Sequence, residues 1–182
     1  MFRLLAKYSR RRARDISRFC VAGQGGAAVE FALIAPAFFG LLIAVFETAL
    51  FLFAQMNLQT AANQAGRYFM TGQAQNGGWT ASAIQTHVCP TIQALLTCGN
   101  VQVVVQNYAS FAAANTSAPQ LYSNGQPVKT FAYNPGTPGE VMVVQLVYQW
   151  SVVSGPLGFV LSNLPNGAAE IVGVAAFRVE PY

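Results

Sequence analysis

Residues Phe31–Ala54, which read FALIAPAFFGLLIAVFETALFLFA, form an apolar stretch of 24 residues in a chain of 182. Glu47 and Thr48 are its only clearly polar interruptions. At about 1.5 Å per residue a helix of this length spans roughly 36 Å, which is enough to cross a hydrocarbon core of about 30 Å. The stretch therefore predicts a single transmembrane helix over about residues 31–54, with the lipid bilayer as its surroundings.

Positive charge gathers before this stretch. Seven of the ten Lys and Arg residues lie in residues 1–25, where Asp15 is the single acid, so this leader carries a net charge of +6 and residues 26–182 carry −2. The positive-inside rule places the leader in the cytoplasm and the chain after Gln55 on the other side of the membrane. Because the folded part is slightly acidic, no nucleic-acid partner is expected.

A cleaved secretory signal is the competing interpretation of a basic segment followed by apolar residues. The apolar run is longer than the roughly 7 to 15 residues of a signal core, and its A-x-A triplet, Ala35-Pro36-Ala37, falls in the middle of the run. Ser9-Arg10-Arg11 matches a twin-arginine signal only weakly, since more charged residues follow. The membrane anchor is the interpretation we keep.

The helical pattern continues beyond the membrane stretch. After Ala54 the apolar residues recur at helical spacing, with polar residues between them, as far as Met70. This predicts one helix from about Ala27 to Met70, ending at Gly72 and kinked at Pro36. Such a helix is about 66 Å long, which exceeds the membrane thickness, so its second half must pack on a domain outside.

Two carboxylates stand out in this helix. Glu30 lies at the membrane edge, where an unpaired charge costs on the order of 2 to 3 kcal/mol; it is either a residue favoured by the helix dipole or one that pairs with a cation. Glu47 lies 17 residues later, about 26 Å along the axis. It is either a residue of the outer interface or a contact with a partner subunit or assembly protein.

The boundary between leader and helix contains Gly25 and Gly26. A small, flexible site after a basic leader is one that a membrane protease at the cytoplasmic face could cut.

These segments resemble a known family over residues 20–70. The basic leader, the glycine junction, AAVEFALIAPAFFGLLIAVFE at 27–47 and NLQTAANQAGRYFM at 57–70 are similar to TadE-like minor pilins, or pseudopilins, of the tight-adherence (Tad/Flp) type IV pilus system. The resemblance implies cleavage by a prepilin peptidase after Gly25, which makes Glu30 the fifth mature residue. A cut after Gly26 would make it the fourth. Phe31 follows the glutamate, as in TadE-like proteins.

The resemblance also implies a role and partners. The precursor waits in the bacterial inner membrane as a single-pass protein with its C-terminal domain periplasmic or extracellular. It then joins or primes an adhesive pilus with other pilin and pseudopilin subunits and the assembly platform proteins. Cleavage exposes an α-amino group with a pKa near 8, which Glu30 of a neighbouring subunit can neutralise. Glu30, Phe31 and Glu47 are thus the expected subunit-assembly residues.

Residues 73–182 predict a small α+β domain outside the membrane. A helix is expected at Thr80–Thr97, and strands at Val101–Tyr108, Glu140–Val153 and Glu170–Glu180, with a long connection at Ala112–Gly139. Short links without a strong intervening helix favour an antiparallel sheet, one face of which packs on the amphipathic half of the long helix. The apolar loop Gly155–Gly167 is expected to pack beneath the sheet or to contact a subunit or membrane.

The domain's two cysteines, Cys89 and Cys98, flank the second half of the expected helix. On a straight helix their Cα atoms would be about 13 Å apart, against a limit of about 7 Å for a disulfide, so pairing would require the helix to break at Pro90. An oxidising compartment favours pairing, whereas Cys20 in the leader stays reduced.

No enzyme chemistry is expected. His87, Cys89 and Cys98 do not have the spacing of a metal site, and His87 with Cys89 lacks an orienting acid for catalysis. We therefore expect no catalytic residues, no metal and no cofactor. The alternative function is a single-pass, membrane-anchored binding module whose C-terminal domain captures a ligand or partner.

Overall fold

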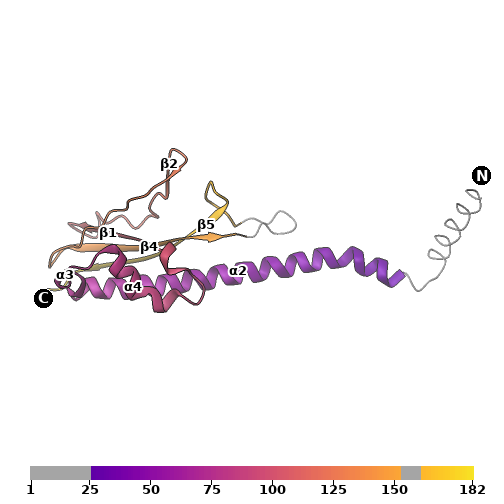
Figure 1. Cartoon of the computed structure of the whole chain (residues 1–182), viewed down its shortest axis with the longest axis horizontal. Helices are drawn as coiled ribbons and strands as arrows, with labels where there is room; N and C mark the ends of the chain where they lie inside the picture. Colours follow the sequence, from indigo (N-terminus) through magenta and orange to yellow (C-terminus); the bar gives the residue numbers. More distant parts are fainter. Residues whose placement is uncertain (1–25, 153–160) are drawn as a thin grey trace, which may run out of the picture. The chain divides into compact units, whose positions relative to one another are not determined.

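The computed structural model describes residues 26–152 and 161–182 (Figure 1). The basic leader, Gly25 and residues 155–160 of the apolar loop lie outside the described residues. The elements in chain order are α2 (Gly26–Met70), α3 (Gln73–Asn76), α4 (Ala81–Ile92), the 3₁₀ helix η1 (Cys98–Asn100), β1 (Gln102–Tyr108), β2 (Tyr122–Ser123), β3 (Gln126–Pro127), β4 (Val141–Ser151) and β5 (Ala168–Arg178).

The predicted long helix is confirmed as α2, with Pro36 inside it. Gly72, which follows the helix, has a φ of 73°, a conformation that glycine adopts without the penalty of a side chain. The chain divides into two compact units. The described part of the first is residues 26–45 of α2; the second comprises residues 46–152 and 161–182.

The second unit is built on a three-stranded antiparallel sheet in the order β1-β4-β5, as predicted. β4 is central, with Val144 opposite Val105 of β1 and Ala175 of β5. An α+β fold with a long N-terminal helix and a small antiparallel sheet is therefore confirmed. Both β4 and β5 begin within two residues of the predicted strands.

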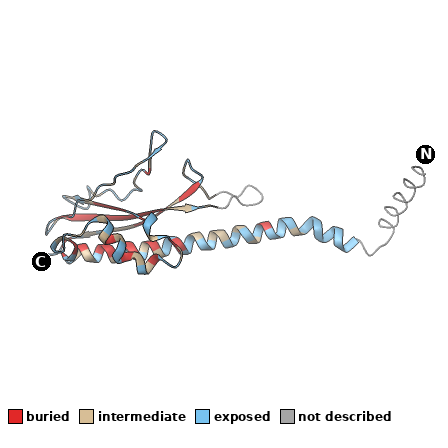
Figure 2. Ribbon diagram, viewed as in Figure 1, coloured by how far each residue is buried: buried red, intermediate tan, exposed pale blue. Residues whose placement is uncertain are grey.

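The main core lies between this sheet and the second half of α2 (Figure 2). Leu58 and Phe69 are fully buried there, and the alanines between them let the helix approach the strands closely. The α4 side chains Ile84, Val88 and Ile92 belong to the same cluster, so α4 packs on the same face of the sheet. The amphipathic pattern after Ala54 has thus produced the contact that it predicted.

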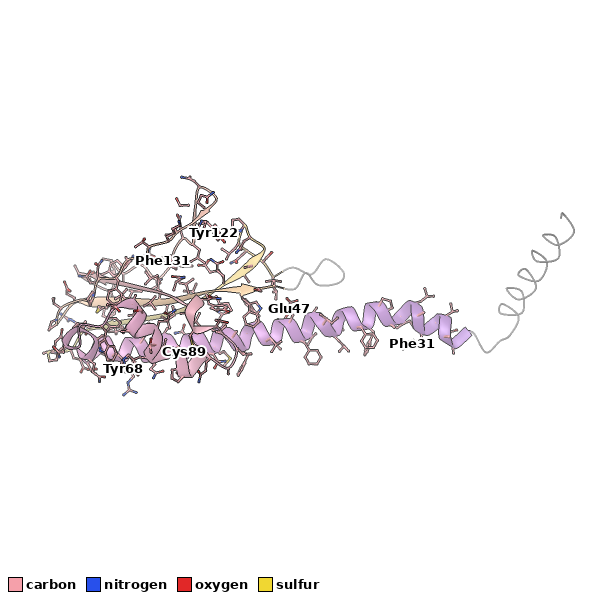
Figure 3. The ribbon with its side chains drawn as sticks, viewed as in Figure 1. Phe31, Glu47, Tyr68, Cys89, Tyr122 and Phe131 are labelled. Carbon is pink, nitrogen blue, oxygen red and sulfur yellow. A yellow bond between two sulfur atoms is a disulfide. The ribbon has the colours of Figure 1, made fainter. Side chains whose placement is uncertain are left out.

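The opposite face of the sheet is covered as well. β4 is buried on both faces from Val141 to Tyr148, because the connection between β1 and β4 folds over it and brings Leu121 onto Val104 and Val147. Tyr122 and Phe131 lie on this side in Figure 3, away from Tyr68 and Cys89. The long connection therefore contributes a second, smaller apolar cluster, which the sequence pattern did not indicate.

The end of α4 corrects one prediction. The helix expected to reach Thr97 stops at Ile92, and Cys89 and Cys98 form a disulfide with a Cα–Cα distance of 5.5 Å. The expectation that pairing would break the helix at Pro90 was wrong, since α4 runs through Pro90 and the chain reverses afterwards. Gln85 holds the returning chain by donating to the carbonyl oxygens of Cys98, at 2.6 Å, and Val101, at 2.9 Å.

Candidate functional site: the exposed apolar helix

The apolar side chains of residues 26–45 are exposed around the whole helix. Phe31 is 67% exposed, Leu33 76% and Leu41 62%. At 100° per residue these positions and their apolar neighbours cover every side, which is the pattern of a helix whose surroundings are themselves apolar. Within the described residues α2 is the one helix long and apolar enough to cross a membrane. These features fit a single-pass membrane anchor.

Glu30 is exposed near the start of this helix. The first turn, beginning at Gly26, contains no acidic residue, so Glu30 comes just after the turn in which a helix dipole acts most strongly. Residues four apart lie on the same side of a helix, which places Glu30 one turn above Gly26. A β-carbon at Gly26 would have no atom of the described chain within 4 Å, so the helix start is unpacked.

Phe31 projects from the helix beside Glu30 in sequence (Figure 3). Farther along, Phe38 and Phe39 are also more than half exposed, and their rings meet edge to face with centroids 5.5 Å apart. Together these aromatic side chains give the segment a large apolar surface that nothing in the same unit covers within the described residues. The geometry fits a contact surface for lipid or for other apolar helices.

Glu47 belongs to the second unit, where it is half-buried next to the 67% exposed side chain of Phe46. Both roles predicted for Glu47, an interface residue or a subunit contact, stay predictions. Gly25 lies outside the described residues, so the site of cleavage stays a prediction as well.

His87 occupies an aromatic cluster. Its ring stacks on Trp79 with centroids 3.9 Å apart and planes 11° apart, and Tyr68 lies 5.7 Å from it. Both nearby sulfur atoms are used in the disulfide. In residues 26–152 and 161–182 no group of three or more His, Cys, Asp or Glu side chains could hold a metal ion. The cluster packs α4 on α2 through ring contacts.

The pKa values of two carboxyl groups, Glu140 just before β4 and Glu170 in β5, are shifted in opposite directions. Glu140 accepts hydrogen bonds from the Thr137 N–H, at 2.8 Å, and from Asn107, at 3.2 Å, which lowers its pKa. Desolvation by burial raises the pKa of Glu170. Each is explained by its own surroundings, and sequence reasoning singled out neither.

Sequence reasoning also missed Gln59. The side chain of Gln59, on the amphipathic half of α2, donates to the carbonyl of Val174 at 2.7 Å and accepts from the Val174 N–H at 3.0 Å. A glutamine among many in this segment carries no signal of such a role, because the partner lies 115 residues away.

Comparison with known proteins supports the resemblance. Residues 25–67 match the family model of TadE-like proteins. The match spans Gly25, Gly26, Glu30, Phe31 and Glu47 and ends within the half of α2 that packs on the sheet. No curated protein and no solved structure matches the chain. The similarity to TadE-like proteins is therefore confirmed for this segment.

Proposed function

We propose that this chain is a structural minor pilin, or pseudopilin, of a Tad/Flp pilus system. Its precursor would sit in the inner membrane with residues 1–25 in the cytoplasm, residues 26–72 as the long helix and residues 73–182 forming the domain outside. A prepilin peptidase would cut after Gly25, and the mature chain would take part in building an adhesive pilus. One observation carries the proposal: the exposed, all-round apolar helix is the segment that matches TadE-like proteins.

The physical argument concerns what drives assembly. In a bilayer the apolar side chains of residues 26–45 gain little by meeting another helix, because lipid tails are equally apolar. A charge pair behaves differently. An α-amino group at Gly26 and a carboxylate at Glu30 are costly in a low-dielectric setting unless each meets an opposite charge. Glu30 of one subunit and the new amino terminus of its neighbour would thus select one another.

The partners follow from this role. We propose a prepilin peptidase, other pilin and pseudopilin subunits and the assembly platform proteins of the inner membrane. Phe31 and Glu47 would contribute contacts along the helix. No catalytic residue is part of the proposal, and the chain would act through binding and packing alone.

The test is to co-express the chain with a prepilin peptidase and to determine the mature N-terminus. Intact mass and N-terminal sequencing of membranes and of sheared surface fractions should show a chain that starts at Gly26. Gly25→Leu should block the cut, whereas Gly23→Leu, two residues earlier in the same leader, should leave it unchanged. A start at Ala27 would move the cut to the second glycine.

Two outcomes would contradict the proposal. An uncut chain starting at Met1 and confined to membranes would favour the alternative, a membrane-anchored binding module. A chain starting beyond Gln55 would indicate a secreted domain.

A further inference from the structure

The two edge strands of the sheet, β1 and β5, differ in the backbone pairing on their outer sides. At the β1 edge, Val105 forms backbone hydrogen bonds with the chain that follows β3: its N–H donates to Ala132 at 2.9 Å, and its carbonyl accepts from Asn134 at 2.9 Å. At the β5 edge no strand pairs on the outer side within the described residues. An open edge presents a row of backbone donors and acceptors that another chain can pair with.

Alternate residues of β5 point their backbone groups away from β4. At the start of the strand, side chains of the preceding loop occupy these positions: Asn166 accepts from Ala168 N–H at 3.1 Å and Asn163 from Glu170 N–H at 2.8 Å. Just past the end of the strand, Glu180 N–H donates to the carbonyl of Met70 at 3.0 Å. Both ends of the edge are therefore closed.

In the middle of the β5 edge, the side chain of Gln59 occupies the outward backbone groups. Its side-chain amide makes both a donor and an acceptor bond with Val174, which is the pair of bonds that a residue of a neighbouring strand would make. The backbone of β5 at this point is thus aimed outward and accessible to an amide group.

Between Val174, which bonds to Gln59, and Glu180, which bonds to Met70, the outward backbone groups of the β5 edge are open. The alternation makes Ala176 and Arg178 the next outward-facing positions, and within the described residues their backbone N–H groups have no partner on that side. Both residues are exposed. A groove of about 380 Å³ lies here, lined by Asn63, Gly66, Arg67, Met70 and residues 174–177. It has room for a short extended segment beside the strand.

The charge at this edge indicates the kind of partner. The described residues contain three Lys or Arg side chains, and one of them, Arg67, lines the groove. Arg178, which ends β5, donates from Nε to the carbonyl oxygen of Gly139 at 2.7 Å. Symmetric antiparallel pairing with a second copy would bring like charges together, which is unfavourable directly across strands. An acidic segment would meet Arg67 instead.

We propose that the β5 edge at Ala176–Arg178 is a docking site where an extended, acidic segment of a partner protein adds as a further strand. Backbone hydrogen bonds to Ala176 and Arg178 would hold the segment, and a carboxylate on Arg67 would select it. This interaction is separate from helix assembly and does not depend on pilus formation.

The experiment uses the purified full chain in detergent micelles and the peptide acetyl-Thr-Val-Glu-Val-Glu-Val-Thr-amide. Calorimetric titration and residue-level hydrogen exchange should show binding that protects the amides of Ala176 and Arg178. A peptide with lysines in place of the glutamates should bind at least tenfold more weakly. A peptide methylated at alternate backbone nitrogens, which cannot form the strand bonds, should not bind.

Matched variants test the two parts of the site. Ala176→Pro removes an outward N–H without touching the bonds to β4, so it should abolish binding, whereas Ala176→Val keeps the N–H and should bind normally. Arg67→Gln should weaken binding severalfold, and Lys129→Gln, which removes the remaining cation of the described residues, should not. The unfolding midpoint of each variant checks its folding.

The proposal is overturned if the acidic peptide at millimolar concentration leaves Ala176 unprotected, or if it binds the folded Ala176→Pro variant as well as the original chain. Protection of Ala176 through self-association of the full chain would also overturn it. If the proline variant fails to fold, the methylated peptide still tests the strand bonds, and the Arg67 and Lys129 variants still test the charge selection.

Discussion

Gly173 of β5 lies directly against the backbone of Leu58 in α2. A β-carbon at position 173 would lie 2.5 Å from the carbonyl oxygen of Leu58, and the nearby backbone atoms would be within 3.0 Å. Real β-carbons do not approach backbone this closely, so the strand and the helix can meet here only because residue 173 has no side chain. This crossing sets how closely the amphipathic half of α2 packs on the sheet.

Gly173→Ala should therefore destabilise the domain by about 1–3 kcal/mol, the usual cost of overfilling a packed core. Denaturant or thermal unfolding of the full chain in detergent measures the change. Gly99→Ala is the control, because a β-carbon at Gly99 would have nothing within 4 Å in the described chain. Equal stability of the two variants would mean that the helix can shift away from β5 at little cost.

The disulfide should stabilise the fold measurably. It closes a short loop between Cys89 and Cys98, so the double change Cys89→Ser and Cys98→Ser should cost about 2–3 kcal/mol, chiefly by freeing the unfolded chain. Thiol labelling of the native protein should show both cysteines protected until a reductant is added. Labelling of both without reductant would contradict the pairing.

Glu170 should make stability depend on pH. Burial raises the pKa of its carboxyl in the folded state above the value in the unfolded chain, so the folded state holds the proton more tightly. Its contribution is fully present at pH values below the unfolded pKa, near 4.3, and is lost as the pH rises through the folded pKa. Glu170→Gln should consequently gain stability relative to the original chain between about pH 4 and 7.

Unfolding midpoints across this pH range provide the measurement for Glu170. The control is Glu180→Gln, which changes an exposed carboxylate near the end of the chain. A stability difference between the Glu170 variant and the original chain that stays constant with pH would show that Glu170 titrates alike in both states.

Glu30→Gln should impair assembly and leave folding intact. The side chain is exposed in the described residues and lies in the unit that excludes the sheet, so the variant should insert, fold and be cleaved normally. Without the charge pair to a neighbour's amino terminus, association should fall by roughly a hundredfold or more.

The amounts of Glu30→Gln protein in sheared surface fibres and in membranes measure its assembly, with Glu180→Gln as the control. Normal recovery of the Glu30 variant in fibres would leave Glu30 as a residue of the helix start and nothing more.

The sequence by itself determined the parts of this protein that repeat with a local period. The apolar run at 31–54 and the helical spacing after it specified α2 to within a residue, and the alternation in 140–153 specified β4 and its inner face. These predictions succeeded because a helix and a strand each impose their period on consecutive residues. Glu30 was singled out by its place at the membrane edge after the glycine junction, and Phe31 by the resemblance to TadE-like proteins; their roles in assembly stay predictions.

Only the tertiary structure decided the contacts between distant segments. Gln59 and Val174 are 115 residues apart, and the local sequence around each residue gives no indication of their contact. After Ile92 the chain reverses and joins Cys98 to Cys89, and Gln85 donates to two carbonyl groups of the returning chain. In the sequence Gly173 is a glycine within a strand, and only the folded structure shows that the Leu58 backbone packs directly against it. Such features depend on which elements meet, and this is settled by packing of the whole domain rather than by local pattern.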